Sequence, residues 1–348
     1  MKYYICEREF DGFDSLTARG KAREDAEKIV KREGYMPIEI DVPDRSSYSI
    51  PKKILWQFRI IPYWKKNLKH ASKGDELFIQ FPFREHSVFL PLIMRRTAKR
   101  GVRITMLVHD LEKYRCLREQ GRSVFDKVKC YFDAKSLKYA NKLILHNKKM
   151  IEAAKKDGLN DTRMYELGIF DYLCEVSRTG KRGLNEPVVI AGNLTQKKSG
   201  FAYDLPSGTA FNLYGPGYEG GPSGLIDVKG KFSPEELPSV IDGSFGLVWD
   251  GPSADTCDGV FGKYLKINAP HKTSLYLASG LPVIIWKDAA MADFIKQNGL
   301  GITIDSISEI PSRIKLLSDR DYEIMLQNVN KISGKIRTGF YLKSALEK

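Results

Sequence analysis

KYLKINAPHKTSLYLASGLPVIIW, residues Lys263–Trp286, runs from a polar, cation-bearing segment into an amphipathic helix, a Gly-Leu-Pro turn and an apolar strand. This order predicts a helix–turn–strand unit of a parallel α/β sheet. The first N–H groups of a helix have no partner within it and carry a partial positive charge. Because His271 and Lys272 stand beside them, the start of this helix suits a diphosphate.

The same segment supplies further candidate ligands for an anion. The hydroxyl and N–H groups of Thr273 and Ser274 suit phosphate oxygens, and Asn268 would then lie near a base or a ribose. Polar residues are also common at solvated helix starts that bind nothing. The pattern alone leaves both interpretations open.

Strands and helices alternate on both sides of this segment, which predicts a second parallel sheet in the first half of the chain. A helix is expected over Ser15–Gly34, and the segment 173–186 loses its apolar periodicity and gathers Gly, Arg and Lys, as a linker does. The predicted strands are Glu76–Phe81, Arg103–Val108, Lys142–His146, Thr209–Tyr214, Gly246–Trp249, Pro282–Trp286 and the start of 187–194.

Length and composition favour a soluble chain of two domains. The 348 residues are about twice a usual domain, and no run of about 18 apolar residues occurs. The acidic, polar start is unlike a signal peptide, so the expected location is the cytoplasm. Five cysteines stand without zinc-like spacing and are expected to be reduced. We expect an N-terminal domain over 1–172, a second over 187–330 and a terminal helix over 331–348.

The net charge of +13 calls for an anionic partner: nucleic acid, a membrane face or phosphorylated substrates. The segment 52–70, KKILWQFRIIPYWKKNLKH, interleaves cations with aromatic and aliphatic residues and suits an anionic membrane surface. A helix that packs its apolar side inward, with lysines reaching outward, explains the same pattern. No signature of a nucleic-acid-binding fold accompanies it, so we expect no nucleic acid partner.

Two strand ends carry further candidates, because ligands bind beyond the carboxyl ends of parallel strands. His109 and Asp110 follow the strand RITMLV, where a carboxylate can deprotonate an acceptor hydroxyl; Asp14 is a rival base. Such residues are as often helix or turn caps. Gly192 and Asn193 in the turn AGNL let the backbone approach a ligand, with Lys197 within reach of a phosphate. An ordinary strand-to-helix turn is the alternative.

Several segments together resemble one known family. They are LVHDLEKYR (107–115), FIQFPF (78–83), ELGIFDY (166–172), VVIAGNL (188–194), SFGLVWDG (244–251), PHKTSLYLASGLPVII (270–285) and TGFYLKSAL (338–346). The family is the bacterial GT-B glycosyltransferases that include β-1,6-galactofuranosyltransferases and adhesin-glycosylating glucosyltransferases. The resemblance spans nearly the whole chain and is looser between 40 and 75.

The resemblance implies two Rossmann-like domains facing a cleft, with a C-terminal helix crossing back to the N-terminal domain. It implies a UDP-sugar as co-substrate, inversion at the anomeric carbon and no metal or other cofactor. It places Lys272 at the diphosphate, Gly192 and Asn193 against the nucleotide, and Tyr214 near uridine. A Lys-Ala-Arg-x-Asp pattern recurs at 21–25. The resemblance assigns Lys21, Arg23 and Gln80 to the acceptor side.

The sequence therefore predicts transfer of a hexose, galactofuranose first, from a UDP-sugar to a sugar hydroxyl of a surface glycan. His271 precedes Lys272 where the adhesin glucosyltransferase has tyrosine, and this difference favours galactofuranose over glucose. UDP-glucose transfer by the same family and a non-catalytic sugar- or nucleic-acid-binding protein are the alternatives. The expected partners are the donor, a glycan acceptor that lipid can carry, the inner membrane face through 52–70, and a second copy of the chain in a homo-oligomer.

Overall fold

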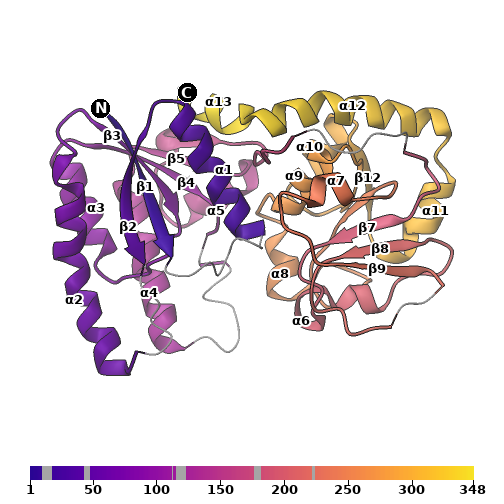
Figure 1. Ribbon diagram of the computed structural model, residues 1–348, viewed down its shortest axis with the longest axis horizontal. Helices are drawn as coiled ribbons and strands as arrows, with labels where there is room; N and C mark the ends of the chain where they lie inside the picture. Colours follow the sequence, from indigo (N-terminus) through magenta and orange to yellow (C-terminus); the bar gives the residue numbers. More distant parts are fainter. Residues whose placement is uncertain (10–17, 43–47, 112, 115–122, 176–181, 222–223) are drawn as a thin grey trace. The chain divides into compact units, whose positions relative to one another are not determined.

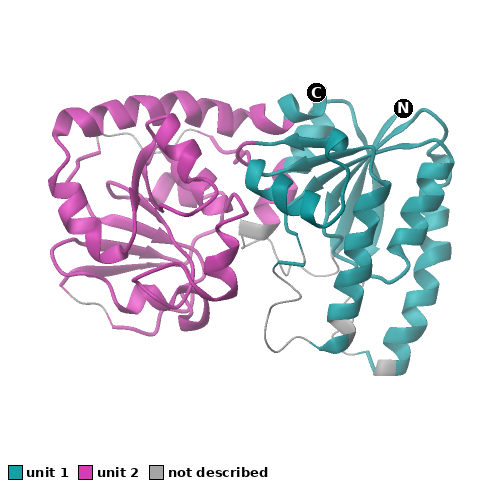
Figure 2. Cartoon of the chain, turned by 180° about the vertical axis from the view of Figure 1, so that it is seen from behind, with its two compact units in different colours: residues 1–13, 26–167, 343–348 teal, residues 14–25, 168–342 magenta. Residues whose placement is uncertain are grey.

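The computed structural model describes residues 1–9, 18–42, 48–111, 113–114, 123–175, 182–221 and 224–348. The chain divides into two compact units, coloured separately in Figure 2. Unit 1 comprises Met1–Phe13, Ala26–Leu167 and Lys343–Lys348, and unit 2 comprises Asp14–Asp25 and Gly168–Leu342. The division falls at Gly168, ahead of the segment 173–186 in which the sequence predicts the linker.

Unit 1 is built on a six-stranded parallel sheet with the order β2-β1-β3-β4-β5-β6. Its central strands are mostly apolar because both faces of the sheet are covered, and only the first residue of β3 is less than fully buried. The strands are β1 (Lys2–Glu9), β2 (Met36–Val42), β3 (Glu76–Phe81), β4 (Arg103–Val108), β5 (Lys142–Leu145) and β6 (Met164–Glu166). The expected bounds of β3 and β4 are confirmed.

The helices of unit 1 cover this sheet (Figure 1), and α3 contacts both α2 and α4. The segment expected to be helical at 52–70 is α2 followed by a short 3₁₀ turn, and no helix in the described ranges has the length and apolarity to cross a bilayer. The helices are α1 (Ala18–Arg32), α2 (Ile50–Asn67), α3 (Leu90–Lys99), α4 (Val124–Ala134) and α5 (Lys148–Lys156), with 3₁₀ turns η1 (Leu68–His70), η3 (Lys135–Tyr139) and η4 (Asp161–Arg163).

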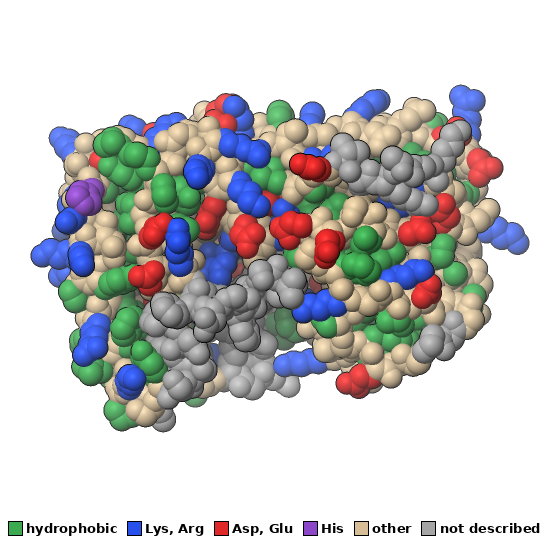
Figure 3. All heavy atoms as spheres, viewed as in Figure 1, with side chains coloured by type: hydrophobic (Ala, Val, Ile, Leu, Met, Phe, Trp, Pro, Cys, Tyr) green, Lys and Arg blue, Asp and Glu red, His purple; other side chains and the backbone are tan. Residues whose placement is uncertain are grey.

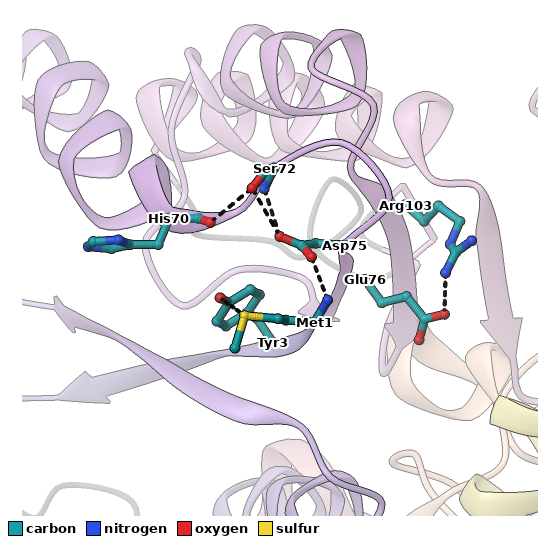
Figure 4. Close-up of polar contacts among 7 residues, drawn as sticks. All are labelled: Met1, Tyr3, His70, Ser72, Asp75, Glu76 and Arg103. Atoms are coloured by element: carbon teal, nitrogen blue, oxygen red, sulfur yellow. Dashed lines mark hydrogen bonds and ion pairs between the residues drawn. The ribbon is translucent and has the colours of Figure 1, made fainter.

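Polar contacts tie together the amino ends of three strands in unit 1, as Figure 4 shows. The terminal ammonium of Met1 pairs with Asp75, whose other carboxylate oxygen accepts the Ser72 N–H at 2.8 Å. Beside them the Arg103 guanidinium of β4 donates to the Glu76 carboxylate of β3 at 2.8 Å. These contacts lie at the edge of the sheet opposite the carboxyl strand ends and therefore stabilise the fold without approaching the candidate site.

Unit 2 carries a second six-stranded parallel sheet, with the order β12-β11-β10-β7-β8-β9. The order reverses between β7 and β10, which is where ligands bind in doubly wound sheets. The strands are β7 (Val188–Ala191), β8 (Phe211–Tyr214), β9 (Ile226–Gly230), β10 (Gly246–Val248), β11 (Val283–Trp286) and β12 (Gly301–Ile304).

The helices of unit 2 are shorter, except for α12, which ends at Gly339 in the left-handed conformation usual for a helix stop. They are α6 (Gln196–Ser199), α7 (Leu237–Val240), α8 (Gly259–Tyr264), α9 (His271–Ala278), α10 (Ala292–Gln297), α11 (Ile310–Lys315) and α12 (Asp319–Thr338), with 3₁₀ turns η5 (Gly200–Tyr203) and η6 (Ile307–Glu309). The last helix, α13 (Phe340–Glu347), begins in unit 2 and ends in unit 1.

Both parts of α13 are anchored by side chains of their own unit. In unit 2 the Asp171 carboxylate accepts the N–H groups of Tyr341 at 3.1 Å and Leu342 at 2.8 Å, at the positive end of the helix. Burial raises the pKa of Asp171 to about 7 even though these hydrogen bonds lower it. In unit 1 the Lys142 ammonium donates to the carbonyls of Ala345 and Leu346.

The position of α9 depends on a glycine in β10. A Cβ added to Gly246 would lie 2.1 Å from the ring of Tyr276, a fully buried residue of α9. The Tyr276 hydroxyl accepts the Ala191 N–H of β7 at 2.8 Å. Only glycine at 246 lets this ring reach the sheet, and the ring fixes the helix that starts with His271 and Lys272.

Gly246→Ala is therefore expected to destabilise unit 2 by about 1–3 kcal/mol or more, because overpacking of a dense core forces side chains off their rotamers. Gly334→Ala in α12 is the matched control, since nothing lies within 4 Å of its added Cβ. That variant is expected to gain about 0.5–1 kcal/mol. Urea unfolding of both variants measures the difference, and equal midpoints would contradict the packing argument.

Candidate functional site

The turn after β7 lies at the switch point of the unit 2 sheet. Gly192 has φ 133°, and its N–H donates to the Tyr214 carbonyl at 2.9 Å. Asn193 is exposed, and its side-chain oxygen accepts the N–H of Thr195 at 3.0 Å and its hydroxyl at 2.7 Å. The predicted nucleotide-binding turn is thus an exposed Asx turn held by its own side chain.

The Lys272 ammonium lies in the first turn of α9 and reaches the end of β10. It donates to the Trp249 carbonyl and to the Asp250 carboxylate, each at 2.8 Å. These two contacts use two of the three N–H donors of the ammonium. Both side chains remain slightly exposed, at 15% and 12%. The structure therefore brings the predicted cation to the switch point, with Asp250 as a partner that the sequence did not identify.

Two hydroxyls in the same turn are buried. Thr273 and Ser274 are 0% and 1% exposed, and their side-chain oxygens have no hydrogen-bond partner among the residues that the structure describes. A buried hydroxyl without a partner costs about 1–3 kcal/mol and calls for an explanation. Asn268, three residues before α9, has a buried side-chain oxygen in the same condition. The two hydroxyls and the first N–H groups of α9 can donate to phosphate oxygens, whereas the Asn268 oxygen can only accept and suits a ribose hydroxyl or a base N–H group.

Other predicted nucleotide contacts lie elsewhere in unit 2. Tyr214 is 2% exposed; its hydroxyl donates to the Val240 carbonyl at 3.2 Å and accepts the Asp242 N–H at 3.0 Å. The structure therefore places this ring in the core of unit 2, and its position near uridine stays a prediction. Lys197 is exposed on α6, close in sequence to the turn at Gly192.

A buried ion pair joins α1 to the segment that opens unit 2. The Lys21 ammonium donates to Asp25 at 2.7 Å and to the Leu173 carbonyl at 2.6 Å, and the Leu173 N–H donates back to Asp25 at 2.8 Å. Lys21 is 3% exposed and Arg23 5%. These contacts explain why Asp14–Asp25 groups with unit 2, although the sequence places Lys21 and Arg23 in the N-terminal domain.

His271 lies beside this ion pair. Its ring stacks on Tyr172 with centroids 5.0 Å apart and planes at 27°, and the Lys21 ammonium lies 5.2 Å from the centre of the same tyrosine ring. Burial lowers the pKa of His271 to about 4; the backbone of Asp171 opposes the shift and the Lys21 charge adds to it. The imidazole is therefore neutral at neutral pH and acts here as an aromatic spacer rather than as a cation.

The depressed pKa of His271 predicts a loss of stability in acid. Between its usual pKa of 6.5 and about 4 the unfolded chain binds a proton that the folded chain does not, so stability falls as pH decreases through this window. The full effect at the lower limit is roughly 3 kcal/mol. His271→Phe keeps the ring contact with Tyr172 and removes the titration, so urea unfolding of this variant should depend less on pH than that of the native protein. Identical pH dependence would contradict the assignment.

A second group of polar side chains lies at the carboxyl strand ends of unit 1. His109 contacts Gln80 through Nε2 and Oε1 at 2.7 Å, and the Gln80 amide nitrogen donates to Glu27 at 3.3 Å. Because Gln80 uses its nitrogen toward Glu27, its oxygen accepts, and His109 Nε2 carries the proton. The structure thus joins two residues that the sequence singled out separately.

Asp110 follows His109 directly and is half-buried. Its charge acts on His146, a buried residue after β5, whose pKa burial lowers to about 4 against the opposing effects of Asp110 and of the Val108 and His109 backbone. The His146 imidazole is therefore neutral at neutral pH although Asp110 favours its charged form. The rival base, Asp14, lies outside the described residues.

The loop after β3 holds polar residues that sequence reasoning did not single out. The Glu7 carboxylate of β1 accepts the N–H groups of Arg84 at 3.0 Å and Glu85 at 3.3 Å, and His86 Nδ1 lies 2.8 Å from the Asp133 carboxylate. The run Arg84-Glu85-His86, two residues after a buried strand, was the available signal. These residues add hydrogen-bonding groups to the edge of the sheet that carries His109 and Asp110.

Family descriptions match almost the whole chain. The glucosyltransferase 3-like N-terminal domain matches residues 2–169, and the glucosyltransferase 3-like C-terminal domain matches residues 188–348. The chain is 36% identical over 348 residues to the beta-1,6-galactofuranosyltransferase WbbI of Escherichia coli K12, covering 96% of this chain and 95% of that protein. It is 22% identical over 276 residues to Glucosyltransferase 3 of Streptococcus parasanguinis, covering 78% of each.

Solved structures share the fold at low identity. The lipopolysaccharide outer core galactosyltransferase WaaB matches with a TM-score of 0.59 and 13% identity over 99% of this chain and 97% of its own. A sucrose-phosphate synthase from Thermosynechococcus elongatus matches with a TM-score of 0.62 and 12% identity, covering 99% of this chain and 97% of its own. Anabaena HepE, solved in complex with UDP, matches with a TM-score of 0.57 and 10% identity, covering 99% of this chain and 98% of its own. Two parallel-sheet α/β domains of the GT-B fold are thereby confirmed.

Proposed function

The chain belongs to the glucosyltransferase 3-like family and is a glycosyltransferase of GT-B type, and from this premise we propose that it transfers galactofuranose from a UDP-sugar to a sugar hydroxyl of a surface glycan. The family predicted from the sequence is confirmed. The 36% identity to a galactofuranosyltransferase along 96% of the chain supports the choice of donor sugar. The match to a glucosyltransferase at 22% identity makes UDP-glucose the alternative donor.

One feature of the structure carries the proposal: the first turn of α9 combines a lysine with two buried hydroxyls that have no partner in the described part of the chain. Helix N–H groups, an ammonium and hydroxyls are the groups that hold a diphosphate. The fold relative HepE has been solved with UDP and with UDP-glucose, which supports a uridine nucleotide as the ligand.

In the proposed reaction the acceptor hydroxyl oxygen attacks the anomeric carbon of the donor. The bond from that carbon to the UDP oxygen breaks, and UDP leaves with the electron pair. The Asp110 carboxylate takes the hydroxyl proton as general base, with Asp14 as the second candidate. Attack opposite to the leaving group inverts the anomeric carbon. Lys272 and the N–H groups of α9 stabilise the negative charge that develops on UDP, without a metal ion in this role.

Each unit contributes its own part to this scheme. Unit 2 holds the donor through the turn at Gly192 and Asn193 and through the start of α9. Unit 1 supplies Asp110, while the hydrogen bond from His109 to Gln80 holds the loop that carries it. Lys21 supports the position of His271 through Tyr172 and is thereby a positioning residue rather than a ligand.

Calorimetric titration of the metal-free protein with UDP, GDP and dTDP tests the proposal. Selective UDP binding supports the donor class, and turnover of UDP-galactofuranose in preference to UDP-glucose then supports the sugar. Turnover of UDP-glucose alone would replace galactofuranose by the alternative. Binding of none of the three nucleotides would refute the uridine donor and favour a non-catalytic binding protein.

A further inference from the structure

Helix α2 presents large apolar side chains to solvent. Ile54, Leu55 and Phe58 are 46%, 54% and 60% exposed, while Gln57, Ile60 and Trp64 face the core of unit 1. The spacing of the exposed residues puts them on one side of the first half of the helix. Burying such side chains is worth about 1.5–3 kcal/mol each, so a row of them in water calls for a partner.

Helix α4 presents a second apolar row. Val124, Val128 and Tyr131 are 79%, 41% and 51% exposed and follow one another at helical spacing of four and three residues. The Lys135 ammonium lies 4.4 Å from the Tyr131 ring centre and continues the row with a cation. Each row thus combines exposed apolar residues with neighbouring basic residues.

The two rows lie on the two helices that pack against α3. Helix α3 contacts both α2 and α4. The loop before α3 is tied to α2 by the ring contact of Phe58 with Phe89 at 5.3 Å, and to α4 by the 2.8 Å contact of His86 Nδ1 with the Asp133 carboxylate. We call the rows together the α2–α4 face: Ile54, Leu55, Phe58, Val124, Val128 and Tyr131.

The charged residues of α2 and α3 are all basic. Neither helix contains an aspartate or a glutamate, while α4 contains Asp126 and Asp133, of which Asp133 is fully buried. Figure 3 shows blue basic and green hydrophobic side chains interspersed over the region that Figure 1 labels α2. The basic residues of 50–70 are Lys52, Lys53, Arg59, Lys65, Lys66 and Lys69.

From this combination we propose that the α2–α4 face docks on the surface of an anionic lipid bilayer. Aliphatic and aromatic side chains enter the boundary between headgroups and acyl chains, and the surrounding cations bind the headgroups. A second copy of the chain is disfavoured, because a two-fold interface would place these cations against each other. Single-stranded nucleic acid is disfavoured because four of the six exposed residues are aliphatic and offer no ring for base stacking.

The α2–α4 face lies beside the proposed acceptor site. Helices α2 and α4 follow the carboxyl ends of β2 and β4, and Figure 1 shows their first turns extending beyond the strand ends. His109 and Asp110 lie at the same edge of the same sheet. This inference rests on the proposed function: the docked enzyme would have its acceptor site next to a glycan carried by a membrane lipid.

Co-sedimentation of the full chain with vesicles tests the docking. Vesicles of phosphatidylcholine mixed with phosphatidylglycerol should bind at least about tenfold more tightly than phosphatidylcholine alone, and salt should weaken the binding. Leu55→Ser/Phe58→Ser should lose about tenfold or more in partition coefficient. Lys52→Gln/Arg59→Gln should lose roughly 25-fold, since each basic residue near an anionic surface contributes about fivefold.

Matched variants of unit 2 serve as controls. Leu316 and Ile324 are exposed apolar residues at 79% and 47%, and Lys315 and Lys331 are exposed lysines. Leu316→Ser/Ile324→Ser and Lys315→Gln/Lys331→Gln should bind vesicles like the native protein. Native urea unfolding of all four variants shows that each is folded, and UDP titration of the same variants separates failure of docking from failure of the proposed function.

Three results would overturn the proposal. Equal binding to neutral and anionic vesicles would remove the electrostatic part, and native binding by both α2 variants would exclude this face. The third result is self-association without lipid, or binding of single-stranded RNA, that the α2 variants abolish while their vesicle binding persists. Such a result would assign the α2–α4 face to a second copy of the chain or to RNA.

Discussion

Lys272→Ala is expected to raise the dissociation constant for UDP by about 10- to 100-fold, because a charge-assisted hydrogen bond contributes about 1.5–3 kcal/mol. The ratio kcat/KM should fall further, by about 100- to 1,000-fold, since the charge on UDP is greatest as the glycosidic phosphate bond breaks. Removing the ammonium also leaves the Asp250 carboxylate, 2.8 Å away in the native protein, to repel the diphosphate. Calorimetry and initial rates measure the two effects.

Lys296→Ala is the matched control for this experiment. Lys296 is an exposed lysine of α10, in the same unit but outside the first turn of α9. The control should keep native UDP affinity and native turnover. If Lys272→Ala also bound UDP with native affinity, the diphosphate would not lie at the start of α9, and the central assignment of the donor site would fail.

Asp110→Asn is expected to lower kcat by about 100- to 10,000-fold, the usual contribution of a general base. The amide matches the carboxylate in shape but cannot accept the proton of the acceptor hydroxyl. UDP affinity should stay native, because Asp110 belongs to unit 1 and the proposed donor site to unit 2. Steady-state kinetics with saturating acceptor, together with UDP titration, separate these two effects.

Asp161→Asn provides the comparison, since Asp161 is an exposed carboxylate of unit 1 that pairs with Lys155 at 3.0 Å. Its kcat should be native. A kcat for Asp110→Asn within a few fold of native would move the role of base to Asp14, and Asp14→Asn would then be the decisive variant.

The sequence pattern predicted the strands whose consecutive residues are mostly apolar. The runs of β3 and β4 are mostly apolar because both faces of a parallel sheet are covered, and their ends could be predicted to the residue. The strand expected at Thr209–Tyr214 is shorter in the structure, Phe211–Tyr214. The ends of strands and helices depend on contacts with other segments, which sequence periodicity does not reveal.

Lys272, Gly192 and Asn193 could be proposed from sequence because a strand end or a helix start is itself a local signal. The partner of Lys272 could not, since Asp250 is 22 residues away in sequence. The resemblance places Tyr214 near uridine, and the structure adds that its hydroxyl bonds to the Val240 carbonyl in the core of unit 2. This hydrogen bond joins residues 26 positions apart, so the sequence pattern could not predict it.

The sequence by itself determined the two parallel α/β sheets, the family and the residues at the strand ends. Apolar periodicity, turn residues and motifs are properties of residues close together in sequence. The tertiary structure alone decided that Lys21 joins unit 2 through Leu173, 152 residues away, and that His271 is neutral against Tyr172. It also decided which side of α2 stays in water. These properties arise from desolvation and long-range contacts, which exist only once distant segments pack together.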